Sequence, residues 1–173
     1  MEENQPKTGK FAMNYGLLTG LVGVVFGVML FVMEMHYEQS AAIQITQTLI
    51  LAAGIIFAII QFKKAGGGFL NLSNALKVGA GVALIAAIVG LLYFFILSNV
   101  IEPGYLDKVY EIGKIKAMTD NPSLTEEQVD QGIEMQKGFA WIMYPVGIVI
   151  NVLIGLFFSL ITGLILKKEE AAY

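Results

Sequence analysis

The chain has no cysteine and no arginine, and it contains a single histidine among its 173 residues. Without cysteine it cannot form a disulfide, a thiolate metal site or a bacterial lipid anchor attached to cysteine. Without arginine it lacks the planar side chain that holds phosphates and carboxylates through two parallel hydrogen bonds. A single histidine excludes catalysis by a histidine pair. These absences leave few of the side chains on which common enzymes depend.

Charged residues are scarce as well, at 14% of the chain, and they leave four long stretches without any charge. These stretches cover residues 11–33, 39–62, 78–101 and 138–166. Each one is long enough to cross a bilayer, for which about 20 apolar residues suffice. This pattern excludes a water-soluble domain, a nucleic-acid-binding protein and a disordered tail. No segment between the stretches has room for a large catalytic domain.

The sequence therefore predicts an all-α integral membrane protein that forms a single membrane domain over residues 1–173. We expect four transmembrane helices in a bundle, at residues 14–35, 42–62, 75–99 and 139–166. An amphipathic helical loop of residues 102–137 joins the last two spans. The first apolar stretch exceeds the roughly 7–15 residues of a signal-peptide core, so we expect a retained span.

The distribution of lysines predicts the orientation in the membrane. With four spans, both termini and the loop between the second and third spans share one side, which carries seven lysines against four on the other. By the positive-inside rule, the side with seven lysines is cytoplasmic. Ten of the fourteen acidic residues fall on the opposite side. We therefore expect a protein of the inner (cytoplasmic) membrane with both termini in the cytoplasm.

Small residues recur at helical spacing in two of the predicted spans. The first span has glycines at i, i+4, i+7 and i+11, and the third span repeats the spacing 63 residues later: Gly16, Gly20, Gly23 and Gly27, then Gly79, Ala83, Ala86 and Gly90. Such stripes let two helix backbones approach closely in lipid. Three interpretations are open: ordinary packing seams, two helical hairpins related by an axis along the membrane normal, or a homodimer face.

Polar residues are few within the spans. Asn151 lies near the middle of the fourth span, and the second span opens with four polar residues, Gln44, Thr46, Gln47 and Thr48. An amide at this depth either bonds to a neighbouring helix or lines a pathway for a polar solute. No ionisable residue lies at the centre of any span, which argues against a proton-coupled carrier.

Two segments have features of a ligand site, and each also has a structural interpretation. Soft ligands that suit Cu(I) cluster at the end of the first span, but Met35 and His36 point away from Met29 and Met33 unless the helix has ended before them. Gly66, Gly67 and Gly68 follow two lysines, as in phosphate-binding loops, but lack the Gly-Lys-Ser/Thr ending. A flexible turn, with Ser73 or Asn74 capping the next helix, is the alternative. We predict no catalytic, cofactor or metal residues.

The outer loop, residues 102–137, is expected to contain two helices. The first covers residues 105–118, and the sequence Asp120-Asn121-Pro122 ends it. A capping box then starts the second helix, formed either by Ser123 with Glu126 or by Thr125 with Gln128. This helix continues into the fourth span, where Pro145 either starts the span or kinks it. The loop acts as a solvated lid or as a surface for a partner.

The segment of residues 66–79 reads Gly-Gly-Gly-Phe-Leu-Asn-Leu-Ser-Asn-Ala-Leu-Lys-Val-Gly, and Glu102-Pro103 follows the third span. With these motifs the chain resembles a family of small four-helix bacterial inner-membrane proteins known only as a domain of unknown function. The resemblance covers nearly the whole chain. It implies a four-helix membrane fold and supplies no site residue.

The expected function is that of a non-enzymatic multi-pass membrane protein. It would act through its helices or its loop, as a homo-oligomer or as an accessory subunit of another membrane protein, with the lipid bilayer as its surroundings and no nucleic acid. The alternative is a small oligomeric transporter or channel for a polar solute, built around Asn151 and the polar opening of the second span. An intramembrane enzyme ranks last, because no acid and base share one depth.

Overall fold

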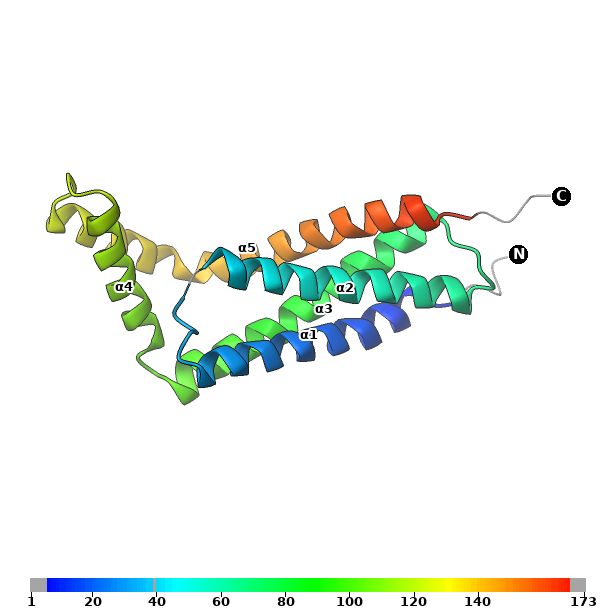
Figure 1. Cartoon of the computed structure of the whole chain (residues 1–173), viewed down its shortest axis with the longest axis horizontal. Coiled ribbons are helices and arrows are strands. Elements are labelled where there is room, and N and C mark those ends of the chain that lie inside the picture. Colours follow the sequence, from blue (N-terminus) through cyan, green and yellow to red (C-terminus); the bar gives the residue numbers. More distant parts are fainter. Residues whose placement is uncertain (1–5, 39, 169–173) are drawn as a thin grey trace. The chain divides into compact units, whose positions relative to one another are not determined.

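The computed structural model describes residues 6–38 and 40–168, and over these residues the chain is all-α (Figure 1). Its helices are α1 (Thr8–Val32), α2 (Ala41–Ala65), α3 (Leu72–Ile96), α4 (Tyr105–Asp120) and α5 (Glu126–Leu166). Helix α3 continues into a widened π-helical turn, Leu97–Ile101. The predicted order of three spans, a short loop helix and a last span is confirmed.

Four of these helices are long and apolar enough to cross a membrane: Thr8–Val32, Ala41–Ala65, Leu72–Ile101 and Glu126–Leu166. A helix of 25 residues is about 38 Å long, which exceeds the hydrocarbon thickness of about 30 Å. The protein is therefore a multi-pass membrane protein. Helix α1 begins earlier than the predicted residue 14 and ends at Val32, so residues 33–35 lie in the turn that follows.

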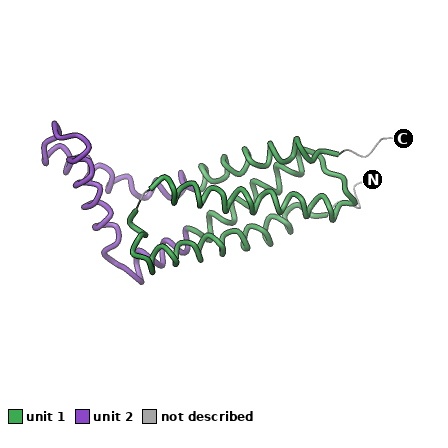
Figure 2. Tube along the Cα trace, viewed as in Figure 1, with its two compact units in different colours: residues 1–90, 148–173 green, residues 91–147 purple. Residues whose placement is uncertain are grey.

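The chain divides into two compact units, coloured separately in Figure 2. Unit 1 contains Met1–Gly90 and Ile148–Tyr173, and unit 2 contains Leu91–Gly147. Unit 1 therefore holds α1, α2, most of α3 and the second half of α5. Unit 2 holds the end of α3, all of α4 and the first half of α5.

The core of unit 1 lies where α2, α3 and α5 pack together. Helix α2 contributes large side chains, among which Ile55, Ile59 and Phe62 are almost completely buried. Helix α3 faces them with smaller residues such as Ala75, Gly79 and Ala83. Because lipid chains are as apolar as leucine, close van der Waals contact is what holds such helices together. Alternation of large and small residues provides that contact.

Helices α1 and α2 end in the same way but with different residues. In both, the residue after the C-cap adopts a left-handed conformation, with φ of 60° at Glu34 and 69° at Gly67. In both, the amide of the following residue donates to a carbonyl and closes a six-residue segment, from Met35 N to Leu30 O and from Gly68 N to Lys63 O. These bonds form the Schellman motif, which usually has glycine at the left-handed position. Helix α2 follows this preference, and α1 does not.

Helix α3 is capped by Asn71, whose Oδ1 accepts a hydrogen bond of 2.7 Å from the amide of Asn74. The predicted caps, Ser73 and Asn74, were wrong because both lie inside the first turn of the helix. The start of α2 is capped by Ser40, whose hydroxyl accepts a bond from the amide of Ile43.

Candidate functional site

Close contacts between α3 and α5 in unit 1 form a small-residue seam, which consists of Gly79 and Ala83 on α3 with Gly155 and Ser159 on α5. A methyl group built on Gly79 would overlap the side chain of Ser159, and one on Gly155 would overlap Ala83. Ser159 is fully buried and donates a hydrogen bond to the carbonyl of Gly155 on its own helix. The seam therefore depends on residues that lack bulk.

The α3 half of this seam belongs to a stripe predicted from the sequence, whereas the α5 half was not predicted. The signal was present, since Gly155, Ser159 and Gly163 follow one another at intervals of four residues. Residues spaced by four lie on one helical face. Gly163 continues the contact, because a methyl group there would lie 2.9 Å from the side chains of Ala75 and Leu72.

The glycine stripe of α1 is only partly used in packing. A methyl group on Gly16 would lie 2.6 Å from Cβ of Ile85, and one on Gly20 would lie 2.7 Å from Cβ of Val89. Gly23 has nothing within 4 Å, and Gly27 is half-buried. Gly16 and Gly20 therefore pack closely against α3, and Gly23 does not.

The stripes on α1 and α3 have different partners, which bears on the idea of two related hairpins. The α1 stripe faces α3, whereas Gly79 on α3 faces Ser159 of α5 and Ile55 of α2. A two-fold axis relating the hairpins would make the α3 stripe face α1. The packing of these glycines does not follow that symmetry.

Asn151 is half-buried on α5, one turn before Gly155 and on the same helical face. It therefore lies on the side of α5 that packs within unit 1. The hydroxyl groups of other membrane residues bond to their own helices: Thr46 donates to Ala42 O, and Thr48 donates to Gln44 O. Such bonds satisfy hydroxyl groups inside lipid without a ligand.

The polar opening of α2 includes side chains that are more exposed than Asn151. Gln44, Ile45, Thr48 and Leu49 line an open recess of about 280 Å³. Gln44 and Gln47 are exposed, and Thr46 and Thr48 are half-buried. Asn151 and this opening are the polar features that the sequence singled out.

Parts of the two suspected ligand segments make structural contacts. The His36 ring lies between those of Phe31 and Tyr37, with centroid distances of 4.9 and 4.1 Å. The amides of Gly66, Gly67 and Gly68 bond to carbonyls at the end of α2, so they cap the helix rather than cradle an anion.

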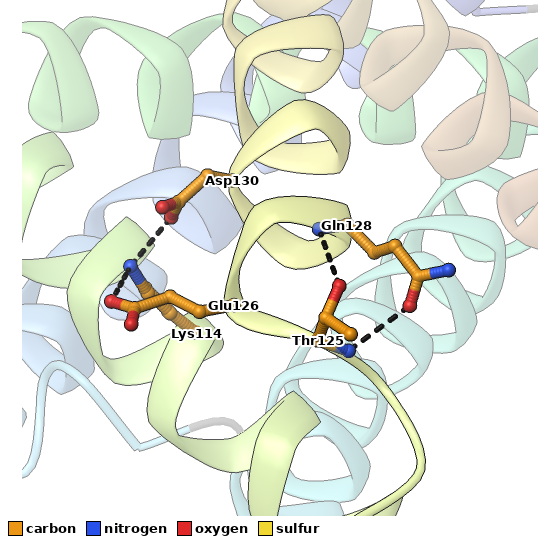
Figure 3. A network of polar contacts seen from close by, with 5 residues as sticks. All are labelled: Lys114, Thr125, Glu126, Gln128 and Asp130. Atoms are coloured by element: carbon orange, nitrogen blue, oxygen red, sulfur yellow. Dashed lines mark hydrogen bonds and ion pairs between the residues drawn. The ribbon is translucent and has the colours of Figure 1, made fainter.

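Unit 2 contains an antiparallel helical hairpin, formed by α4 and residues 126–137 of α5, which we call the outer hairpin. Lys114 of α4 places Nζ 2.8 Å from Glu126 and 2.6 Å from Asp130, both on α5 (Figure 3). The hydrogen bonds that Lys114 donates, first to Asp130 and then to Glu126, raise its pKa. At its other end the hairpin has Lys137, 3.8 Å from Asp107 and 5.1 Å from the centre of the Tyr110 ring.

The start of α5 confirms one of the two predicted capping boxes. The Thr125 hydroxyl accepts a bond from the amide of Gln128, and the Gln128 side chain accepts one from the amide of Thr125 (Figure 3). The helix then runs for 41 residues with Pro145 inside it. At the usual rise this is about 62 Å, twice what a span needs. Helix α5 is therefore both the second arm of the hairpin and the last span.

The outer hairpin buries little of its own surface. No residue of α4 is buried, and Val129 is the buried apolar residue on the facing arm. Large apolar side chains remain exposed, including Ile115 (61%), Met135 (66%) and, just beyond the hairpin, Phe139 (58%). Ion pairs and the buried side chain of Val129 are the contacts that join the two arms.

Comparison with known proteins gives a family and no function. No curated protein and no solved structure matches the chain. The resemblance to a family of unknown function is confirmed: residues 14–168 match the family described as "Protein of unknown function (DUF4199)", and the chain belongs to that family.

Proposed function

We propose that this protein is a non-enzymatic membrane component that binds another polypeptide through its outer hairpin, as a homo-oligomer or as an accessory subunit. The observation that carries the proposal is a hairpin ordered by ion pairs while large apolar side chains stay exposed. Lys114 and Lys137 fix the arms, and Ile115 and Met135 remain uncovered. Exposed apolar groups rimmed by charge are typical of interaction surfaces.

The chemistry of the chain supports a role without catalysis. Its carboxylates lie outside the span centres, and three of them pair with lysines in the outer hairpin: Asp107, Glu126 and Asp130. The buried hydroxyl of Ser159 donates to its own helix. General acid–base catalysis needs groups within hydrogen-bond reach of one substrate. The side chains described above are committed to structural contacts instead.

The same proposal includes a location: the cytoplasmic membrane of a bacterial cell, with the lysine-rich ends of the helices inside. The proposed orientation is based on the excess of lysines on the side of the two termini. Reporter fusions at Asn121 and at each terminus test it. Activity of a periplasmic reporter at Asn121, and of cytoplasmic reporters at the termini, is expected. The reverse pattern would contradict the orientation and put the outer hairpin in the cytoplasm.

The binding role is tested by the native mass of the full chain, extracted with its lipids in a mild detergent. We expect either a multiple of 18.8 kDa or a fixed ratio with one second polypeptide. The variant Ile115→Asn/Met135→Asn should release the partner. The control Lys116→Gln, on an exposed lysine of the same hairpin, should retain it. A monomer under all conditions would contradict the proposal.

A small channel or transporter is the second candidate, and the recess beside Gln44 and Thr48 is the observation that favours it. The position of Asn151 on the packing side of α5 counts against it. Flux of small polar solutes into vesicles with reconstituted protein tests this candidate. It requires flux that Gln44→Leu abolishes, and equal flux from empty vesicles would exclude it.

A further inference from the structure

Four helix ends lie at the same end of unit 1 (Figure 1), which we call the lysine end. They are the start of α1, the end of α2, the start of α3 and the end of α5. Lys63 Nζ donates a 2.8 Å hydrogen bond to Leu166 O, which joins α2 to α5. Leu70 and Lys168 exchange two backbone hydrogen bonds of 2.9 and 3.0 Å. The segments at this end are therefore tied to one another before any ligand binds.

Positive charge is concentrated at the lysine end. Seven lysines lie within or beside the helix ends that lie there: Lys7, Lys10, Lys63, Lys64, Lys77, Lys167 and Lys168. The described carboxylates of unit 1 are Glu34 and Glu38, which lie beyond the opposite end of α1. Four further carboxylates adjoin this end in the sequence and lie outside the described residues: Glu2, Glu3, Glu169 and Glu170. Seven lysines against these four leave this end with a formal net charge of +3.

The lysines at this end have two different roles. Lys63 bonds to a carbonyl, and Lys168 lies 5.6 Å from the centre of the Phe69 ring, so both hold the segments together. Lys10, Lys64 and Lys77 are exposed instead. They lie in the first turn of α1, the last turn of α2 and the second turn of α3. These three come from separate helices and point into the surroundings.

We propose that Lys10, Lys64 and Lys77 form a binding surface for the headgroups of anionic phospholipids. Residues at the ends of membrane spans lie at the depth of lipid phosphates. Lysine binds phosphate as a point charge, and each lysine near an anionic membrane surface adds to the attraction. The fixed arrangement of the helix ends holds the cations in place. The surface belongs to unit 1, so it is independent of the binding role proposed for the outer hairpin.

The test uses the full chain in nanodiscs that contain equal amounts of phosphatidylglycerol and phosphatidylcholine. Lipids retained after mild extraction are counted by native mass spectrometry. The variant Lys64→Gln/Lys77→Gln removes two of the three exposed cations and leaves Lys63 and Lys168 intact. Lys108→Gln/Lys116→Gln, on the outer hairpin, is the control with the same loss of charge. Lys64→Arg/Lys77→Arg keeps the charge and reports any effect on folding.

We expect the ratio of retained phosphatidylglycerol to phosphatidylcholine to fall by about fivefold for each lysine removed from the lysine end. The control and the arginine variant should keep the wild-type ratio. An unchanged ratio in Lys64→Gln/Lys77→Gln, or an equal fall in the control, would overturn the proposal. Displacement of phosphatidylglycerol by millimolar inorganic phosphate would also overturn it, because the ligand would then be a soluble anion.

Discussion

The two ends of unit 1 are built differently. At the lysine end, α2, α3 and α5 bury Ile59, Phe62 and Ala75 almost completely, and α2 ends at a left-handed glycine. At the other end, which we call the turn end, α1 stops at a left-handed glutamate, and polar side chains line an open recess on α2. Leu30 and Ile43 are buried there, but Gly23 has open space beside it.

This difference indicates that the lysine end contributes more to the stability of unit 1, whereas the turn end leaves more surface free for interaction. Small residues on α3 and α5 let the helices approach at the lysine end, so packing energy accumulates there. The turn end keeps polar and apolar groups uncovered. Matched glycine substitutions along a single helix should therefore lower the free energy of unfolding by very different amounts.

The largest effect is expected for Gly79→Leu, with Gly90→Leu as its control on the same helix. A side chain at Gly79 would overlap Ser159 and lie 3.2 Å from Ile55 Cγ2, whereas Gly90 has nothing within 4 Å. Overpacking of this kind lowers the free energy of unfolding by about 3 kcal/mol. Thermal unfolding in detergent measures it. Equal melting temperatures for the two variants would disprove the seam.

A smaller effect is expected for Gly20→Leu compared with Gly23→Leu on α1. Gly20 faces Val89 closely, and Gly23 faces open space. The first substitution should cost about 2 kcal/mol because one side chain of α3 must move. The second should leave the melting temperature unchanged. If Gly23→Leu is as damaging as Gly20→Leu, the turn-end half of α1 is also tightly packed.

The two helix ends offer a reciprocal pair of substitutions. Gly67→Ala places a Cβ in a left-handed conformation and should lower the free energy of unfolding by about 1 kcal/mol. Glu34→Gly relieves the same strain and should raise it by about 0.5 kcal/mol, since glycine also gains entropy in the unfolded chain. Chemical unfolding of the two variants beside the wild type measures both signs. The same sign for both would show that Glu34 is not strained.

The smallest effect concerns pH and the outer hairpin. The pKa of Lys114 is raised above its ordinary value of 10.5 by Asp130 and Glu126. The ion pairs of Lys114 therefore stabilise the outer hairpin fully below pH 10.5. This stabilisation disappears as the pH rises through the higher pKa that Lys114 has in the folded state. Protease cleavage near Asn121 should accelerate in that range. The variant Lys114→Met should be cleaved faster at pH 8 already and should lose this dependence.

Much of the fold could be predicted because hydropathy and capping are local signals. Charge-free stretches located the four spans, and two candidate capping boxes placed the start of α5 to within two residues, of which the Thr125–Gln128 box is the one that forms. The unbroken passage of α5 through Pro145 was left open, because proline is compatible with a helix start or a kink. The cap of α3 was placed two or three residues late, because Asn71, Ser73 and Asn74 are all good caps.

The site was less predictable, because a sequence shows a helical face but not what lies against it. Gly20 and Gly23 belong to one stripe, yet only Gly20 meets α3 closely. The lysines near Gly66 suggested an anion nest, and the backbone bonds of α2 use those amides instead. The helix that packs against a residue and the partner of its backbone amide are set by the folded structure and not by the local sequence. They decide whether a small residue is a seam, a cap or an open surface.

We expect the molecule to pack most tightly at the lysine end and to bind its partner through the outer hairpin. Since the chain has no cysteine, single cysteines test this directly in native membranes. Ile115→Cys lies on the hairpin. Ser73→Cys lies at the lysine end, and both residues are exposed. With a thiol-linked photo-crosslinker, we expect one discrete polypeptide adduct from Ile115→Cys and none from Ser73→Cys. An adduct from Ser73→Cys alone, or from neither position, would contradict the account.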